Sequence, residues 1–203
     1  MLIGVLALQG GFAAHMRTLR GLGVDVREVR VPADLEGVEG LVIPGGESTT
    51  MTLGIEREEL VGPLRELAAA GTPILGTCAG LIMLDREHLG LMDIEARRNA
   101  FGRQVRSFEA DLDVDGLDGP PLRAVFIRAP QIASHGDDVE IVAELEGHPV
   151  AARQGRLLAV AFHPELGRDT RVHEAFLADV RAARSGGRGQ APAGTGAARS
   201  PRT

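Results

Sequence analysis

Short apolar runs alternate with helical patterns along the first half of the chain. Four runs have the length and composition of buried parallel strands: residues 2–8, 24–31, 41–43 and 73–77. Apolar positions at helical spacing predict the intervening helices: residues 12–22, residues 47–70 in two pieces divided near Gly54, and a helix from Ala79 onward. Repeated strand–helix–strand units are typical of a parallel sheet with helices on both faces.

The second half is richer in strands. The pattern predicts five of them with little helix between: residues 101–114, 122–127, 139–145, 150–153 and 157–162. We interpret these as an antiparallel or mixed extension of the same sheet. A last amphipathic helix is expected over 171–184. Residues 185–203 contain Gly, Ala, Pro, Ser, Thr and Arg without apolar periodicity, which predicts a disordered tail behind a single α/β domain over 1–184.

The composition narrows the possible partners and the compartment. The 203 residues carry a net charge of −6, and 44% of them are hydrophobic, as in a soluble globular protein. This charge argues against nucleic-acid and membrane-surface binding. The apolar N-terminal run is too short to span a bilayer and has no basic flank. With a single cysteine, and so no intrachain disulfide, we expect a cytoplasmic protein.

The single cysteine lies in a motif that suits a nucleophile. Residues 76–80, Gly-Thr-Cys-Ala-Gly, connect a predicted strand to a predicted helix. This is the elbow that presents a nucleophile on a strained turn, with glycines where strand and helix approach closely. The N-terminus of the following helix favours a thiolate at Cys78. A lone cysteine is more often a buried structural residue, but its place in this elbow favours catalysis.

A base for this thiol is expected at the end of the last predicted strand. His163 follows the run 157–162, and Glu165 two residues later could orient its imidazole. Carboxyl ends of strands in open α/β sheets are where sites lie. A solvated His beside an unrelated Glu is the alternative. We interpret the remaining histidines as packing or surface residues: His15, His88, His135, His148 and His173.

A glycine turn ends the third predicted strand. Residues 44–49, Pro-Gly-Gly-Glu-Ser-Thr, allow backbone N–H groups to face a developing oxyanion. A helix N-cap at Glu47 or Ser48 explains the same residues, and the two interpretations are compatible. The chain has no Gly-x-Gly-x-x-Gly after its first strand, which argues against a dinucleotide site.

These motifs together resemble a known family. The elbow at 76–80 and Phe-His-Pro-Glu at 162–165 look like the class I glutamine amidotransferases. Further segments resemble, within that class, the glutaminase subunits of two-component pyridoxal 5′-phosphate synthases: residues 8–10, 44–49, 98–104, 126–130 and 151–155. The likeness extends from Met1 to about Arg184. It implies a single flavodoxin-like domain of three layers.

The resemblance also implies the reaction and the site. L-Glutamine would be hydrolysed to L-glutamate and ammonia through a glutamyl thioester, with no cofactor and no metal. By position, Cys78, His163 and Glu165 would form the catalytic triad, and the N–H groups of Gly46 and Ala79 the oxyanion hole. The matched glutamine contacts are Gly46, Glu47, Ser48, Arg98, Ile127 and Arg128. Either arginine could bind the α-carboxylate of the substrate.

The implied partner is a barrel-shaped pyridoxal 5′-phosphate synthase subunit in a hetero-oligomer, to which ammonia would be channelled for vitamin B6 synthesis. The absence of lysine from this chain agrees with that division of labour, because Schiff-base chemistry would then belong to the partner. Two other functions remain open: a stand-alone cysteine hydrolase such as a γ-glutamyl peptidase, and a flavodoxin-like interaction module with an inert cysteine.

Overall fold

The structure, a computed structural model, describes residues 1–98 and 107–187. Its central sheet has seven strands in the order β2-β1-β3-β4-β11-β10-β9. Their bounds are β1 Leu2–Leu6, β2 Asp25–Val29, β3 Gly40–Ile43, β4 Ile74–Thr77, β9 Glu140–Leu145, β10 His148–Gln154 and β11 Leu157–Val160. The first five strands in this order pair in parallel, whereas β10 is antiparallel to both β11 and β9.

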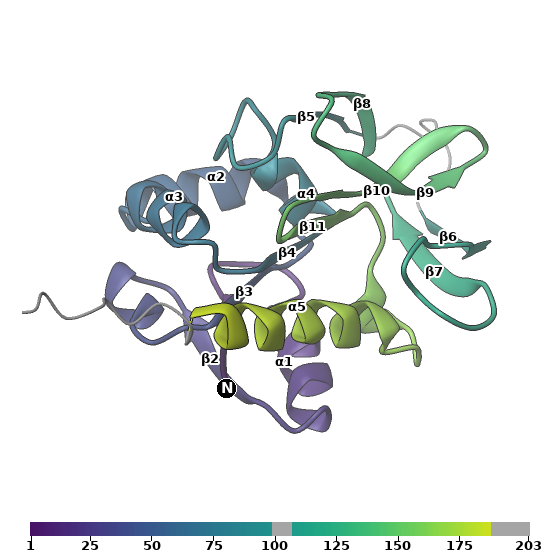
Figure 1. Ribbon diagram of the computed structural model, residues 1–203. Coiled ribbons are helices and arrows are strands. Elements are labelled where there is room, and N and C mark those ends of the chain that lie inside the picture. Colours follow the sequence, from purple (N-terminus) through teal and green to yellow (C-terminus); the bar gives the residue numbers. More distant parts are fainter. Residues whose placement is uncertain (99–106, 188–203) are drawn as a thin grey trace, which may run out of the picture.

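Helices cover both faces of the sheet (Figure 1). On one face lie α1 (Phe12–Gly21) and α5 (Arg171–Gly187), and on the other lie α2 (Ser48–Arg57), α3 (Val61–Ala69) and α4 (Ala79–Leu84). Short 3-10 turns occupy Pro32–Leu35 and Pro164–Leu166. The parallel strands follow the order 2-1-3-4-5 of flavodoxin-like folds. The predicted three-layer α/β fold is confirmed.

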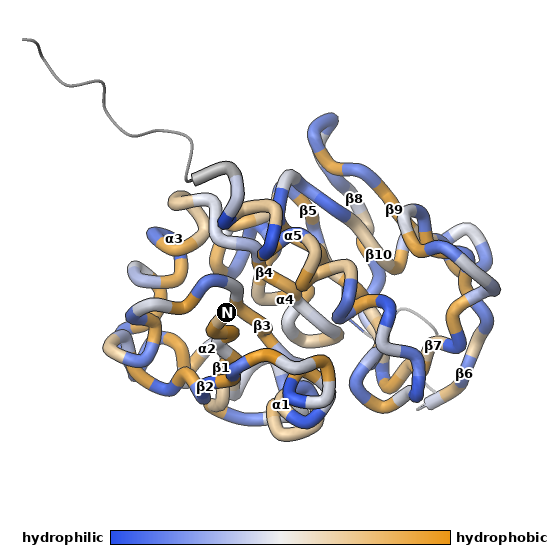
Figure 2. The backbone as a smooth tube through the Cα atoms, turned by 60° about the horizontal axis from the view of Figure 1, so that its bottom comes forward, coloured by the Kyte–Doolittle hydropathy of each residue, from blue (hydrophilic) through white to orange (hydrophobic). Residues whose placement is uncertain are grey.

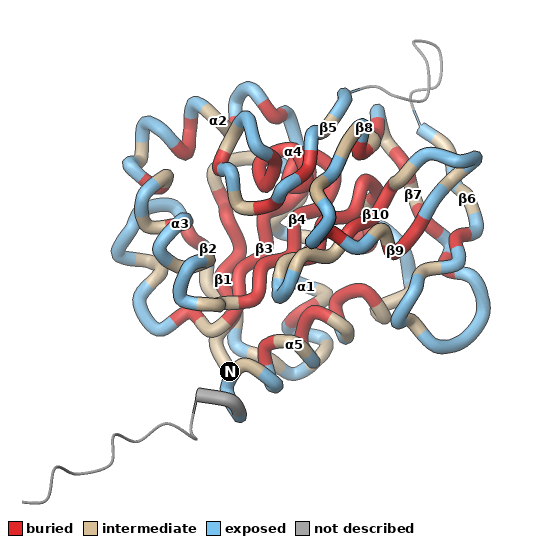
Figure 3. The backbone as a smooth tube through the Cα atoms, turned by 45° about the horizontal axis from the view of Figure 1, so that its top comes forward, coloured by how far each residue is buried: buried red, intermediate tan, exposed pale blue. Residues whose placement is uncertain are grey.

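The central strands are buried along their whole length, and mostly apolar, because helices cover them on both sides. β3 and β4 are buried at every position, and Figures 2 and 3 show the same strands as the apolar, buried centre of the molecule. Within the described residues, no helix has the length and apolar character needed to cross a membrane.

The prediction for the second half is correct only in part. β9, β10 and β11 extend the sheet as expected, but β6 (Ser107–Leu112) and β7 (Leu122–Ile127) form a separate two-stranded sheet. Stacking of Phe108 on Phe126, with ring centroids 4.8 Å apart, and an edge contact of Phe126 with Phe162 attach this pair to the core. The first part of the predicted strand 101–114, residues 101–106, lies outside the described residues.

Two strands were missed, and they pair with each other: β5 (Ile94–Arg97) and β8 (Gln131–His135). Each has a single fully buried residue, Ile94 and Ile132 respectively, so neither sequence shows a clear alternation. A short strand at the surface leaves little hydrophobic pattern to detect.

Two helix boundaries also differ from the prediction. Gly54 lies inside α2, where the missing side chain gives room to Leu8. The division between α2 and α3 falls instead at 58–60, where Glu59 has a φ of +56° that ends the helix. At the C-terminus, α5 continues to Gly187, so the predicted start of the tail at residue 185 falls inside the helix. Residues 188–203 lie outside the described residues.

Candidate active site

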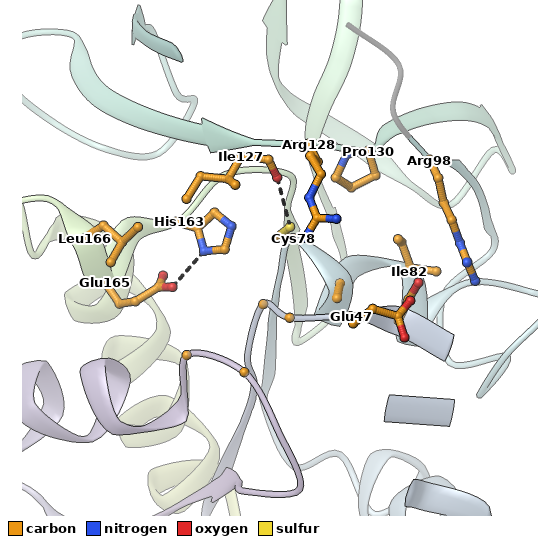
Figure 4. A pocket seen from close by; sticks show the side chains of 16 residues that line it. Glu47, Cys78, Ile82, Arg98, Ile127, Arg128, Pro130, His163, Glu165 and Leu166 are labelled. Carbon is orange, nitrogen blue, oxygen red and sulfur yellow. Dashed lines mark hydrogen bonds and ion pairs between the residues drawn. The ribbon is translucent and has the colours of Figure 1, made fainter. Parts of the chain in front are cut away.

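Cys78 lies between β4 and α4 on a strained turn. Its φ of +50° is the left-handed conformation that residues with side chains rarely adopt. The flanking glycines are required by close approach: a Cβ on Gly80 would lie 2.0 Å from the carbonyl oxygen of Ile43, and one on Gly76 would lie 2.7 Å from the carbonyl oxygen of Gly80. The Sγ–H of Cys78 points to the carbonyl oxygen of Ile127 at 3.8 Å (Figure 4). The turn has the geometry of a nucleophile elbow.

His163 follows β11 and faces Cys78 across the carboxyl edge of the sheet (Figure 4). Its Nδ1 lies 2.8 Å from Glu165 Oε1, and the side chain of Glu165 is almost completely buried. Burial alone would lower the pKa of His163, but hydrogen bonds and charge interactions with Cys78 and Glu165 raise it to about 10. The arrangement therefore favours a protonated imidazole beside Cys78.

The ionised form of Glu165 is also favoured. Burial raises the pKa of a carboxyl group, but the hydrogen bond from His163 and the charge of its imidazolium hold the pKa of Glu165 below its usual value. A buried carboxylate accepting from Nδ1 fixes the imidazole with its other nitrogen free to face the sulfur.

The loop after β3 lies against the N-terminus of α1. Gly11 N–H donates to the carbonyl oxygen of Gly45 at 2.9 Å, and the Gln9 side chain binds both the N–H and the carbonyl of Glu47. Glu47 is the N-cap of α2, and its carboxylate accepts from the N–H groups of Thr49 and Thr50. Those hydrogen bonds lower the pKa of the exposed Glu47 to about 2. The predicted capping role is thus confirmed, and the loop is held beside Cys78.

Two arginines stand at the mouth of the site (Figure 4). Arg128 follows β7 with a φ of +45°, a strained conformation that turns the chain beside Ile127. Arg98 is exposed, and its Nη1 lies 3.3 Å from Thr49 Oγ1. Both guanidinium groups carry a positive charge that suits an anionic group in the cavity.

One cavity of about 360 Å³ collects the predicted residues. Every candidate named from the sequence lines it: Gly46, Glu47, Ser48, Cys78, Ala79, Arg98, Ile127, Arg128, His163 and Glu165. Ala79 is the first residue of α4, so its N–H has no acceptor within the helix. The volume is in the range that small-molecule sites occupy. Segments far apart in the sequence thus meet at one sheet edge.

Other residues at this site were not predicted from the sequence. Ile82, Pro130 and Leu166 also line the cavity. Pro130 belongs to the matched segment 126–130 but was not named as a site residue, and no motif indicated Ile82 or Leu166. His15 and His173, interpreted from the sequence only as packing or surface residues, are completely buried directly behind Glu165. Their contact joins α1 to α5 across 158 positions of the chain, a pairing that local patterns do not reveal. Within the described part of the chain, no three His, Cys, Asp or Glu side chains could together hold a metal ion.

The cavity thus joins a cysteine on a strained elbow to a hydrogen-bonded histidine–glutamate pair, at the carboxyl edge of an α/β sheet. The SNO glutamine amidotransferase family matches residues 5–182, and the chain belongs to that family. It is similar to the pyridoxal 5′-phosphate synthase subunit PdxT of Frankia alni, with 52% identity covering 91% of this chain and 97% of the relative. The PdxT subunit of Herpetosiphon aurantiacus is 56% identical, covering 87% and 99%.

Solved structures agree with the fold. A crystal structure of a glutamine amidotransferase superposes with a TM-score of 0.83 at 43% identity, covering 88% of this chain and 98% of that one. A putative GMP synthase protein from Thermoplasma acidophilum has a TM-score of 0.71 at 21% identity, covering 93% and 98%. This second likeness shows the fold alone.

Proposed function

We propose that the chain is a glutaminase that hydrolyses L-glutamine to L-glutamate and ammonia, and supplies the ammonia to a pyridoxal 5′-phosphate synthase subunit. The observation that carries the proposal is the arrangement of Cys78, His163 and Glu165 in one cavity, in a chain of the glutamine amidotransferase family. The names of the relatives, which are subunits of that synthase, support the partner and the biosynthetic role.

The chemistry begins with Cys78 as a thiolate and His163 as an imidazolium held by Glu165. The sulfur attacks the carboxamide carbon of glutamine, and the carbonyl oxygen becomes an oxyanion that the N–H groups of Gly46 and Ala79 bind. Loss of one such donor typically costs on the order of 100-fold in rate. The C–N bond then breaks, and the departing ammonia takes a proton from His163.

A glutamyl thioester on Cys78 remains after ammonia leaves. His163, now neutral, removes a proton from water, whose oxygen attacks the thioester carbon. The C–S bond breaks and glutamate is released, with the proton returned to the Cys78–His163 pair. These steps require only the chain, its substrate and water.

The cavity also offers recognition for the amino-acid end of glutamine. The Glu47 carboxylate stays ionised at neutral pH and can accept from the substrate ammonium. Arg128 or Arg98 binds the α-carboxylate, and Ser48 and Ile127 complete the lining. Because Arg128 lies beside the carbonyl that Cys78 faces, while Arg98 lies at the exposed rim, the two should differ in their effect on KM (Figure 4).

The partner receives ammonia and forms a hetero-oligomer with this chain. A barrel-shaped synthase and a channel between the two sites belong to the proposal. We also place the reaction in the cytoplasm, where reducing conditions keep the single thiol free.

Glutamate release from L-glutamine tests the proposal, measured on the purified chain alone and with the synthase subunit named for its relatives. We expect release in the complex and its loss in Cys78→Ala, with an unchanged thermal transition. Equal release with and without the synthase would favour a stand-alone hydrolase. Release by Cys78→Ala at the wild-type rate would contradict the triad, and no release despite binding would favour an interaction module.

A further inference from the structure

A buried row of side chains continues from the triad into the layer between α1 and α5. The second carboxylate oxygen of Glu165, Oε2, lies 3.3 Å from His15 Nε2. The same nitrogen is 3.1 Å from Thr77 Oγ1, and His15 Nδ1 is 2.9 Å from His173 Nε2. Both His15 and His173 have no exposed surface. No sequence motif indicated a chemical role for either of them.

Both imidazoles are neutral at physiological pH. Burial lowers the pKa of His15 to about 4, a shift that the charge of Glu165 only partly offsets. Burial likewise lowers the pKa of His173 to about 3. Each ring therefore carries one N–H and one bare nitrogen, and the contacts decide which nitrogen carries the proton.

The carboxylate fixes the tautomer of His15. An ionised carboxylate only accepts hydrogen bonds, so a bare Nε2 would place lone pairs against Glu165 Oε2. The proton therefore lies on Nε2, where it can be shared between Thr77 Oγ1 and Glu165 Oε2. His15 Nδ1 then accepts from Nε2–H of His173.

The far end of the row agrees with this assignment. His173 Nδ1 is buried, and within the described residues it has no hydrogen-bond partner. In the assigned tautomer that nitrogen is bare, so no N–H is left unpaired. The other tautomer would bury an orphaned donor, which costs about 1–3 kcal/mol. Glu165 Oε2 is likewise buried without a hydrogen bond of standard geometry among these residues, which leaves the His15 N–H as the donor that faces it.

We propose that His15, oriented by His173, is a positioning residue for Glu165: its Nε2–H holds Oε2 and so keeps Oε1 aligned on His163 Nδ1. A carboxylate bonded at one oxygen can rotate about its Cγ–Cδ bond, and a donor at the second oxygen stops that rotation. This inference rests on the proposed function, because it takes Glu165 as the third member of the triad.

Removal of the donor has a predictable effect on titration. The groups that face Glu165 are His163 from the loop after β11, His15 from α1 and Thr77 from β4, with His173 of α5 behind His15 and Cys78 beyond His163. Without the N–H of His15, the buried carboxylate loses a stabilising dipole and becomes protonated at higher pH. The acid limb of any process that needs ionised Glu165 should therefore move upward, by roughly one pH unit.

The test compares variants of one position. His15→Leu removes both ring nitrogens, whereas His15→Gln keeps an amide N–H at the position of Nε2. His173→Phe removes the donor that orients His15. His135→Gln is the matched control, because His135 is exposed and does not line the cavity.

Two readouts are measured on each variant. One is the kcat and KM for glutamate release in the complex with the synthase subunit. The other is the pH dependence of Cys78 alkylation by iodoacetamide in the chain, which is unambiguous because the chain has one cysteine. Thermal transitions report the loss of packing separately.

For His15→Leu we expect kcat to fall about 10- to 100-fold, a loss of the size seen when a residue that orients a metal-binding side chain is removed. KM should stay within about twofold, and the acid midpoint of alkylation should rise. His15→Gln should keep most of the wild-type kcat and show the wild-type acid midpoint of alkylation. His173→Phe should lose kcat to an intermediate degree. His135→Gln should match the wild type.

The proposal is overturned if folded His15→Leu keeps the wild-type kcat and midpoint, or if His15→Gln folds and is as impaired as His15→Leu. If His15→Leu does not fold, the other two variants, His15→Gln and His173→Phe, test the proposal instead. A folded His173→Phe with the wild-type kcat and the wild-type acid midpoint of Cys78 alkylation would then overturn the proposal. Failure of the proposed function is distinct, because activity in Cys78→Ala would contradict the triad itself, whatever His15 does.

Discussion

The two walls of the cavity differ in the groups that form them: one is mainly backbone and the other is made of side chains. The front wall, residues 45–48 with Cys78 and Ala79, presents backbone N–H groups and the sulfur of Cys78, and the neighbouring glycines set its shape. The back wall is Glu165, which lines the cavity, together with three buried side chains packed behind it, His15, Thr77 and His173; the four form one polar row. The front wall is made by local turns, whereas the back wall needs α1, α5 and β4 to pack correctly. The front wall carries the reactive sulfur, and the back wall positions the histidine–glutamate pair that acts on it.

The largest effect on kcat should come from changing Glu165, which contacts His163 on one side and His15 on the other. In Glu165→Gln the buried charge is lost, and a neutral amide no longer stabilises the imidazolium of His163. We expect kcat to fall toward 10⁴-fold, as in a serine-protease triad whose aspartate becomes asparagine. KM should change little, since Glu165 does not reach the amino-acid end of the substrate. Glutamate release in the synthase complex measures both constants.

A wild-type kcat in folded Glu165→Gln would show that the back wall is structural only. His135→Gln again serves as the control, because it changes a histidine and leaves the cavity untouched.

Acid should destabilise the back wall before the front wall. The pKa of His15 is about 4 in the folded chain and about 6.5 in an unfolded chain, so below pH 6.5 the unfolded state binds the proton that the folded state refuses. Stability is therefore complete above pH 6.5 and falls as pH decreases toward 4. His15 alone should account for about 3 kcal/mol of this loss.

Urea unfolding at several pH values measures this dependence, with His15→Gln as the comparison. The variant should show a flatter profile between pH 6.5 and 4. An identical slope in both proteins would contradict the assignment of a neutral, buried His15.

A smaller effect is expected from replacing a glycine of the front wall, compared with the same replacement in an ordinary surface helix. Gly80→Ala places a Cβ against the carbonyl oxygen of Ile43, and a backbone atom cannot move away easily. We expect a loss of about 1–3 kcal/mol in the free energy of unfolding and a displaced elbow. Gly62→Ala is the same substitution on α3, where a Cβ meets nothing within 4 Å. It should stabilise the chain by about 0.5–1 kcal/mol.

Denaturant unfolding of the two alanine variants measures the change in the free energy of unfolding for each. Opposite signs are expected, and a stabilised, fully active Gly80→Ala would show that the close approach of β3 and α4 does not shape the elbow.

The same contrast explains how far the sequence could predict the molecule. The alternation of strands and helices in the first half and the elbow at 76–80 follow from local signals, because the elbow carries its glycines beside the cysteine. β5 and β8 were missed since a strand with one buried residue has no readable period. The predicted break at Gly54 was wrong because this glycine makes room for the side chain of Leu8 and does not interrupt the helix. The pairing of His15 with His173 depends on helix packing, which no local pattern encodes.

Covalent capture of Cys78 tests the central claim most directly. The chain in complex with the synthase subunit is treated with a chloroketone analogue of L-glutamine, and its intact mass is followed with and without L-glutamine. We expect one adduct per chain, located on Cys78, formed more slowly in the presence of glutamine and absent from Cys78→Ala. Labelling that glutamine does not slow, or no labelling of a complex that is shown to be assembled, would contradict it.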